Sequence, residues 1–187
     1  MNIEQARSLM EDWTSNPALR VHMECVGACM GGYADQLHQG DDSLKGRWIV
    51  CGILHDYDYE RHPSLEEHPK VGVAHLREHT DVDDEILDAI MGHNPAMGVP
   101  RNSEMSKVLF AVDELAGFIV ACTKVRPNGI SDLAPKSVKK KLKDKAFAAA
   151  VSREDIRLGI EELGVDQTEH IQTCIDAIRG EAERLGV

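Results

Sequence analysis

Aromatic residues and long apolar runs are scarce in this chain. Phenylalanine, tryptophan and tyrosine together account for 4% of the 187 residues, and no segment shows the period-two alternation of a half-buried β-strand. No apolar stretch approaches the roughly 20 residues of a membrane-spanning helix, so we expect no membrane partner. The five cysteines are an odd number without paired spacing, which is typical of reduced thiols rather than of a disulfide framework.

Positive charge is also scarce. The chain has 21 lysine and arginine residues against 32 aspartate and glutamate residues, which gives a net charge of −11. Such a field repels phosphate backbones, so we expect no nucleic-acid polymer as a partner. The start of the chain, MNIEQARSLMEDW, has no apolar core of the kind found in secretory signals, and this favours a cytoplasmic protein. The length favours a single domain over residues 1–187.

Apolar residues repeat with the period of a helix over most of the chain. Within 105–119 and again within 171–185 they recur at intervals of three and four residues. Helices are also expected near 17–38 and 44–55, and a loop at 94–102 separates later helical segments. The sequence therefore predicts an all-α fold, a bundle of about eight or nine helices without a sheet. Further helix starts are predicted at Pro135, Ser152 and Asp166.

One segment departs from the acidic character of the chain. Residues 124–145 contain eight basic and two acidic residues, a local charge of +6. Lys136, Lys139, Lys140 and Lys143 fall on one face of the helix expected there. A charged helix face is most often a solvated surface, but in an acidic chain it is also what an anionic substrate would require. The sequence leaves both interpretations open.

Histidine and aspartate occur together in apolar surroundings. The apolar run that begins at Trp48 ends abruptly in the dipeptide His55-Asp56. Neighbouring side chains on a helix point about 100° apart, so both can reach one metal ion only where the helix ends. His22 and Asp113 lie inside apolar helical stripes, where an unpaired buried charge is strongly unfavourable. Each alone could be an ordinary hydrogen-bonded residue, but their order along the chain favours a shared site.

This order of His, His-Asp and Asp on a helical chain resembles the HD-domain superfamily of metal-dependent phosphohydrolases. Residues 107–113 are similar to the helix that carries the last aspartate of that superfamily. The resemblance covers residues 18–126 and leaves residues 130–187 as accessory helices. It implies an HD-domain helical bundle with a metal-binding core.

Two further segments extend the resemblance to the six-ligand form of the superfamily, which holds two metal ions. His68, in His68-Pro-x-x-Gly72, is similar to the histidine that opens the helix after the HD dipeptide. His93, at the end of residues 86–93, resembles the histidine of the next ligand helix. Three neighbouring histidines compete with His68, and we prefer His68 because of this context at a helix start. The competitors are His62, His75 and His79.

The resemblance implies a centre with two divalent metal ions. Imidazole nitrogens and carboxylate oxygens suit borderline-hard cations such as Fe, Mn, Co, Zn or Mg. A hydroxide between two ions about 3.5–4 Å apart would attack a phosphoryl group. The implied enzyme hydrolyses a phosphate ester or anhydride of a small, anionic, nucleotide-like substrate. One ion would be held by His22, His55, Asp56 and Asp113, and the other by His68, His93 and the bridging Asp56.

The residues after the dipeptide depart from the pattern of many HD phosphodiesterases. Those enzymes continue with Ile-Gly-Lys, whose lysine contacts phosphate, whereas this chain continues with Tyr57-Asp58-Tyr59. In other HD nucleotidases a catalytic glutamate stands at the position of Tyr59. His55-Asp-Tyr57 is closer to HD-type hydrolases that cleave bis-nucleoside polyphosphates. Another basic residue would then supply the phosphate contact, and the candidates are Arg61, Lys107, Arg126, Lys139 and Lys140.

Two other functions fit the same ligand set. Some six-ligand HD proteins resemble oxygenases that hold a mixed-valent di-iron centre and use O₂ to cleave a C–C or C–P bond. The missing lysine after the dipeptide keeps this reaction open. The third hypothesis is a non-catalytic sensor that binds metal or nucleotide, which the loss of one or two ligands would have favoured.

Two of the cysteines lie near a predicted ligand. Cys25 and Cys29 follow His22 at helical spacing and could suggest a zinc site. A tetrahedral zinc site needs a fourth ligand, and there is no paired Cys-x-x-Cys motif. We therefore expect these cysteines to be small buried apolar residues.

Overall fold

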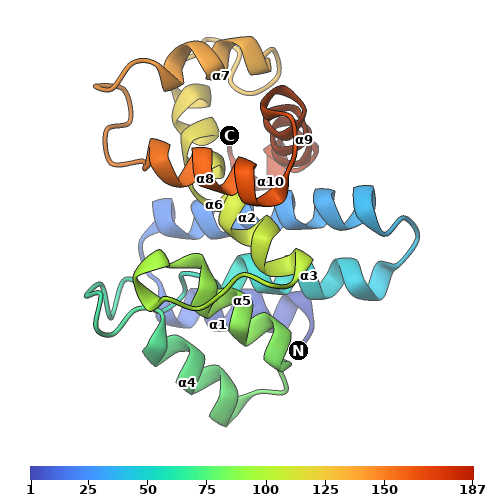
Figure 1. The fold of residues 1–187 in the computed structure, drawn as a ribbon, viewed down its shortest axis with the longest axis vertical. Helices are drawn as coiled ribbons and strands as arrows, with labels where there is room; N and C mark the ends of the chain where they lie inside the picture. The colour runs from blue at the N-terminus through green and yellow to red at the C-terminus, as the bar shows by residue number, and fades with distance from the viewer.

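The computed structural model describes residues 1–187 as α-helices joined by connections of unequal length, the longest of which covers residues 55–69 (Figure 1). Nine of the ten α-helices have seven or more residues and no residue lies in a strand, which confirms the predicted all-α fold. None of the helices combines the length and the apolar character that a membrane crossing requires. The helices are α1 (Ile3–Trp13), α2 (Pro17–Leu37), α3 (Asp42–Leu54), α4 (Lys70–His79), α5 (Asp84–His93), α6 (Glu104–Lys124), α7 (Pro135–Leu142), α8 (Arg153–Leu163), α9 (Gln167–Gly180) and α10 (Ala182–Leu185).

The helix ends follow local capping chemistry. The Ser152 hydroxyl accepts a hydrogen bond from the Asp155 backbone, and the Asp166 carboxylate accepts two from the first turn of α9, so both predicted starts are confirmed. The predicted helix start at Pro135 is confirmed as well. One expectation differs: the helix predicted over 171–185 divides into α9 and α10 at Gly180. Helix α9 ends at Gly180 because glycine has a low helix propensity. The short helix α10 follows and still buries Leu185.

The helices α2 and α3 form the central hairpin. They run side by side across the middle of the molecule (Figure 1) and pack closely over their length. Gly52 of α3 makes this approach possible, because a Cβ atom there would lie 2.7 Å from the Cα atom of Gly27 in α2. The contact brings His22, one turn before Gly27, close to the residues that follow α3.

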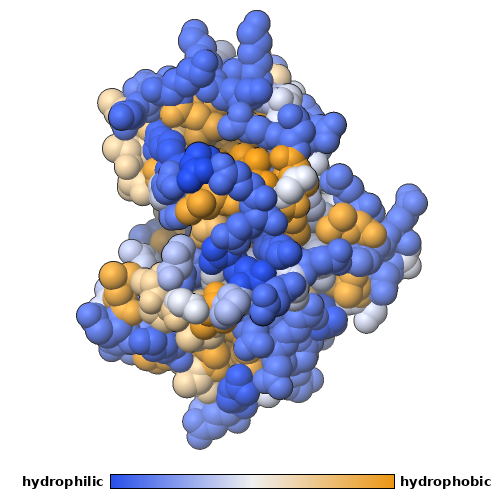
Figure 2. Space-filling view, in the orientation of Figure 1, coloured by the Kyte–Doolittle hydropathy of each residue, from blue (hydrophilic) through white to orange (hydrophobic).

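The helix α6 has more buried residues than any other helix. It packs against α2, α5 and α8, and in Figure 1 it leads from the lower helices α1, α4 and α5 to the upper group formed by α7, α8 and α9. The core contains 40 buried hydrophobic residues between Ala6 and Leu185. All five cysteines are buried and unpaired, and these include Cys25 and Cys29, whose burial was expected. The face shown in Figure 2 is mainly hydrophilic, with smaller apolar patches.

Candidate metal centre

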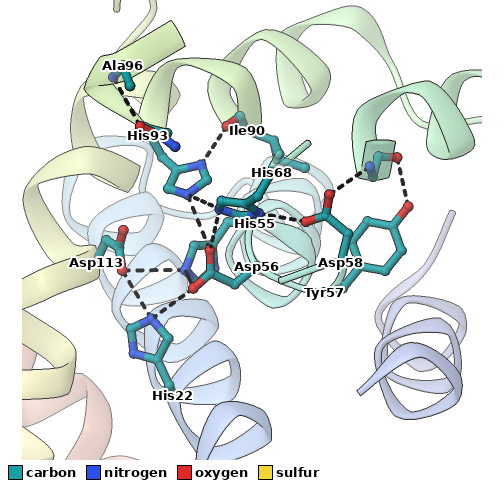
Figure 3. A network of polar contacts seen from close by, with 12 residues as sticks. His22, His55, Asp56, Tyr57, Asp58, His68, Ile90, His93, Ala96 and Asp113 are labelled. Carbon is teal, nitrogen blue, oxygen red and sulfur yellow. Dashed lines mark hydrogen bonds and ion pairs between the residues drawn. The ribbon is translucent and has the colours of Figure 1, made fainter. Parts of the chain in front are cut away.

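The six residues predicted as metal ligands lie together in the structure (Figure 3). They come from five separate segments of the chain. The helix α3 ends at Leu54, so His55 and Asp56 stand where the chain leaves the helix, and their side chains approach each other within 3.3 Å. His93 is the last residue of α5, as predicted. The remaining three are His22 in α2, His68 just before α4 and Asp113 in α6.

The first group of ligand atoms contains two imidazoles and two carboxylates. The Asp113 Oδ1 atom lies 3.1 Å from His22 Nε2 and 3.4 Å from His55 Nε2. The Asp56 Oδ2 atom lies 3.3 Å from the same His55 nitrogen. All four residues offer an atom within 4.8 Å of the others, which is the spacing of donors around one cation.

The second group shares Asp56 with the first. Its Oδ1 atom lies 3.2 Å from His68 Nε2 and 3.2 Å from His93 Nε2, and these two nitrogens are 3.3 Å apart. Asp56 therefore presents one carboxylate oxygen to each group, as a ligand that bridges two metal ions does.

Backbone carbonyls orient two of the histidines. The Nδ1 atom of His55 is 2.7 Å from the Gly52 carbonyl oxygen, and that of His93 is 2.5 Å from the Ile90 carbonyl oxygen. A carbonyl oxygen only accepts, so each Nδ1 carries a proton and each Nε2 faces the cluster, where it can bind a metal ion or a second proton. The His55 Nε2 atom is buried without a hydrogen-bond partner. This buried nitrogen without a hydrogen-bond partner, with carboxylates beside it, fits a metal ligand.

His68 is oriented by a residue that the sequence analysis missed. Asp58, which is 1% exposed, accepts a hydrogen bond from His68 Nδ1 at 2.8 Å and another from the Gly72 backbone N–H at 2.8 Å. A Cβ atom on Gly72 would lie 2.7 Å from Asp58 Cγ, so only glycine fits there. Carboxylates in this position commonly orient metal-binding histidines. The signal was present as an acid two residues after the dipeptide, together with the glycine of His68-Pro-x-x-Gly72.

The carboxylates give the cluster a strong preference for positive charge. Burial acts to lower the pKa of His55, but Asp56 and Asp113 outweigh it and hold this pKa well above its usual range. Burial likewise opposes protonation of His68, yet its hydrogen bonds to Asp56 and Asp58 raise its pKa to about 9. For Asp56, burial acts to raise the pKa, while the charge and hydrogen bonds of the facing histidines hold it well below its usual range. Protons or metal ions are therefore favoured at this position.

A cavity of about 470 Å³ opens onto the cluster. Four of the six predicted ligands line it, and the other lining residues were not singled out by the sequence analysis as parts of a site. Glu114 is one of these: burial, followed by the charge of Asp113, raises the pKa of Glu114 to about 7. A small molecule can therefore reach the bridging carboxylate from this side. The other polar side chains of the wall are Tyr59, Asn94 and Asp155.

A second, larger groove of about 800 Å³ lies against α1, α2, α3 and α9 and contains none of the six residues. Its charged side chains are largely paired with one another, as in the ion pairs of Arg7 and Arg184 with Glu24 at 2.8 and 2.7 Å. No group of three metal-ligating side chains occurs there. The smaller cavity, which the His/Asp cluster lines, is therefore the candidate functional site.

None of the five basic residues predicted to contact phosphate lines the smaller cavity. Arg61 donates to the Trp13 carbonyl oxygen and stacks on its ring, which ties it to the end of α1. Arg126 forms an ion pair with Asp132 at 2.7 Å. On α7, Lys140 is exposed and Lys139 donates to a threonine of α9, so the basic face of this helix lies on the surface. The last of the five is Lys107, in α6.

Among the four neighbouring histidines, the structure places only His68 in the cluster. His62 lies beside Glu67, and the Nδ1 atom of His75 lies 3.2 Å from the Tyr57 hydroxyl. His79 is more than half exposed. The choice of His68 on its sequence context therefore selects the histidine that reaches Asp56.

Comparison of the chain with protein-family models, with curated proteins and with solved structures found no match. The geometry of the His/Asp cluster is therefore the main guide to what this centre can do. It provides two overlapping groups of ligands that could hold metal ions, beside a cavity.

Proposed function

We propose that the protein is a metal-dependent phosphohydrolase of the HD type, with two divalent ions held by the six residues of the cluster. The observation that carries this proposal is the position of Asp56, whose two oxygens face different ligand groups. Two ions that share such a carboxylate lower the pKa of water and stabilise charge on a phosphoryl oxygen. Fe, Mn, Co, Zn and Mg all suit these ligands.

The lining of the cavity is compatible with hydrolysis by a water molecule. It contains no serine, threonine, cysteine or lysine side chain, and its histidines and two of its carboxylates belong to the ligand cluster, so water is the nucleophile that the proposal assigns. The chain's own contribution is to hold the imidazole rings. In His55 and His93, the hydrogen bond from Nδ1 to a backbone carbonyl oxygen fixes the tautomer that leaves Nε2 free for a metal ion. The Asp58 carboxylate accepts the corresponding hydrogen bond from His68 Nδ1. The substrate would be a small phosphorylated molecule, for which a nucleotide-like compound is the first class to test.

Metal content and phosphate release test the proposal together. Protein purified without chelator should contain about two ions per chain and release phosphate from p-nitrophenyl phosphate or a nucleotide panel. Removal of the ions by a chelator should stop this release, and adding them back should restore it. His55→Ala and Asp56→Ala should lose metal and activity together, whereas His79→Ala, at an exposed histidine, should keep both. Retention of metal and activity by the two cluster variants would refute the assignment.

One observation favours a second candidate, a mixed-valent di-iron oxygenase on the same ligands. The cavity has no lysine or arginine to bind phosphate. Oxygen consumption by the iron-loaded protein, with a mixed-valent signal in electron paramagnetic resonance, would move this reaction ahead. Tight binding of a nucleotide without any turnover would instead support the sensor hypothesis.

A further inference from the structure

The cavity beside the centre has few side chains that can donate a hydrogen bond to a substrate. It has no lysine or arginine, and its two carboxylates outside the ligand cluster only accept hydrogen bonds when they are ionised. Two uncharged donors remain outside the cluster, the Tyr59 hydroxyl and the Asn94 amide. A phosphoryl group that enters the cavity would meet its protein donors at these two residues.

We infer that Tyr59 and Asn94 donate hydrogen bonds to the phosphoryl oxygens of the substrate, in place of a basic residue. The phosphoryl group then lies beside the second ligand group, that of His68 and His93. The inference rests on the proposed function, because it takes a phosphorylated molecule to bind at the centre. It adds which residues outside the ligand cluster hold this molecule, and on which side of Asp56 they do so.

Tyr59 is held close to the second ligand group by the turn that follows α3. Its backbone N–H donates to the Asp56 carbonyl oxygen at 2.9 Å, so its position is tied to that of the bridging residue. The Tyr59 ring stands edge-on to the ring of His68, with the ring centres 5.1 Å apart and the planes at 83°. The side chain is 40% exposed, and its hydroxyl forms no hydrogen bond within the protein. This hydroxyl is therefore free to donate to a ligand in the cavity.

Asn94 approaches the same ligand group from another segment of the chain. It directly follows the ligand His93 and caps the 3₁₀ helix Pro95–Met97. Its Oδ1 atom accepts a hydrogen bond from the Ala96 N–H at 3.0 Å (Figure 3). Only the amide oxygen can accept, so this bond fixes the orientation of the amide and leaves its NH₂ group without a partner in the protein. The half-buried side chain presents this donor at the cavity wall.

Both donors therefore flank one ligand group, although they belong to different segments. On the other side of the bridging carboxylate, Glu114 directly follows Asp113 of the first group and offers an accepting carboxylate instead. An anionic oxygen is favoured where donors face it and disfavoured beside a carboxylate. Bound cations would compensate the charge of the phosphoryl group, so uncharged donors are sufficient to orient it, as in many small-molecule sites.

Binding of inorganic phosphate to the metal-loaded, full-length protein tests the inference. Tyr59→Phe removes only the hydroxyl, and Asn94→Asp removes the NH₂ donor while it keeps an oxygen for the Ala96 N–H. We expect each substitution to raise the Kd of phosphate, measured by calorimetry, and the KM of p-nitrophenyl phosphate by about tenfold or more, because a hydrogen bond to a charged group is lost. The metal content should stay that of the wild type, since neither residue is a ligand.

A matched control accounts for the charge that Asn94→Asp introduces. Asn102→Asp adds the same charge at an exposed position outside the cavity and should leave both constants as in the wild type. Tyr59→Phe adds no charge. It also removes no contact within the protein, so it keeps the inference testable even if the substitution at Asn94 disturbs the 3₁₀ helix.

The outcomes separate this inference from the proposed function. Phosphate release by the wild type, with wild-type Kd and KM in Tyr59→Phe, would overturn the inference and leave the hydrolase intact. Raised constants together with a loss of metal would also overturn it, because the residues would then act on the centre rather than on the substrate. No phosphate release by the metal-loaded wild type from p-nitrophenyl phosphate or a nucleotide panel would refute the hydrolase itself.

Discussion

Replacing Asp58 by asparagine should weaken one metal position without removing a ligand. The carboxylate accepts two hydrogen bonds at 2.8 Å, from His68 Nδ1 and from the Gly72 N–H. An asparagine amide has one accepting oxygen, so its NH₂ group must face one of these two donors. A hydrogen bond to a charged group contributes about 1.5–3 kcal/mol, and loss of such supporting bonds typically lowers metal affinity about 10–100-fold.

The loss should be confined to the ligand group of His68 and His93. The other group receives no hydrogen bond from Asp58, so its affinity should change much less. Titration of the chelator-treated Asp58→Asn variant with Mn or Zn, followed by calorimetry, should resolve one weakened and one nearly unchanged binding step. Asp88→Asn, which alters an exposed acid, is the matched control. Two binding steps of wild-type affinity, in a variant whose circular dichroism shows the native helix content, would refute the role of Asp58.

Two further predictions concern stability. Gly52→Ala should destabilise the protein by about 1–3 kcal/mol, because its Cβ atom would overlap the backbone of Gly27. Gly46→Ala on the same helix has open space and should stabilise it by about 0.5–1 kcal/mol, and urea unfolding compares the two; equal effects would contradict the close approach. Burial lowers the pKa of His170 to about 4, below its value of about 6.5 in the unfolded chain, so the unfolded chain binds more protons between these values. The unfolding free energy should therefore fall by about 3 kcal/mol as the pH drops from about 6.5 to 4. His170→Gln should lose this pH-dependent component, and an unchanged slope in the variant would show that the buried His170 is not its source.

Local patterns predicted the helices because their causes are local. The caps at Ser152 and Asp166 act within one turn, and the apolar stripe of α6 follows from the helical period alone. The break at Gly180 was not predicted, because the stripe from Ile171 to Leu185 keeps its spacing across it. A glycine near the end of a helix was the only local sign of that division.

His22, Asp113 and the His55-Asp56 pair could be predicted as a cluster because a charged group is conspicuous in apolar surroundings, whereas His68 and His93 came only from the resemblance. The supporting residues could not be predicted, because they depend on contacts between distant segments. Asp58 meets His68 only when the turn after α3 folds back against the start of α4. Glu114 meets Ser152 only because α8 packs on α6. The strongest local charge pattern, the lysines around Lys140, lies outside the cavity since tertiary packing decides where α7 is placed.

The six residues of the His/Asp cluster come from five segments between His22 and Asp113. Ions bound there would act as removable cross-links between α2, α3, α5, α6 and the start of α4. The helix α4 packs mainly against α5, so these cross-links are a large part of what attaches it to the body of the protein. Bound metal would then determine how often α4 detaches from the rest of the protein. In chains without metal, α4 would be the first segment accessible to proteases. Protein molecules without bound metal would therefore be degraded faster than molecules with metal.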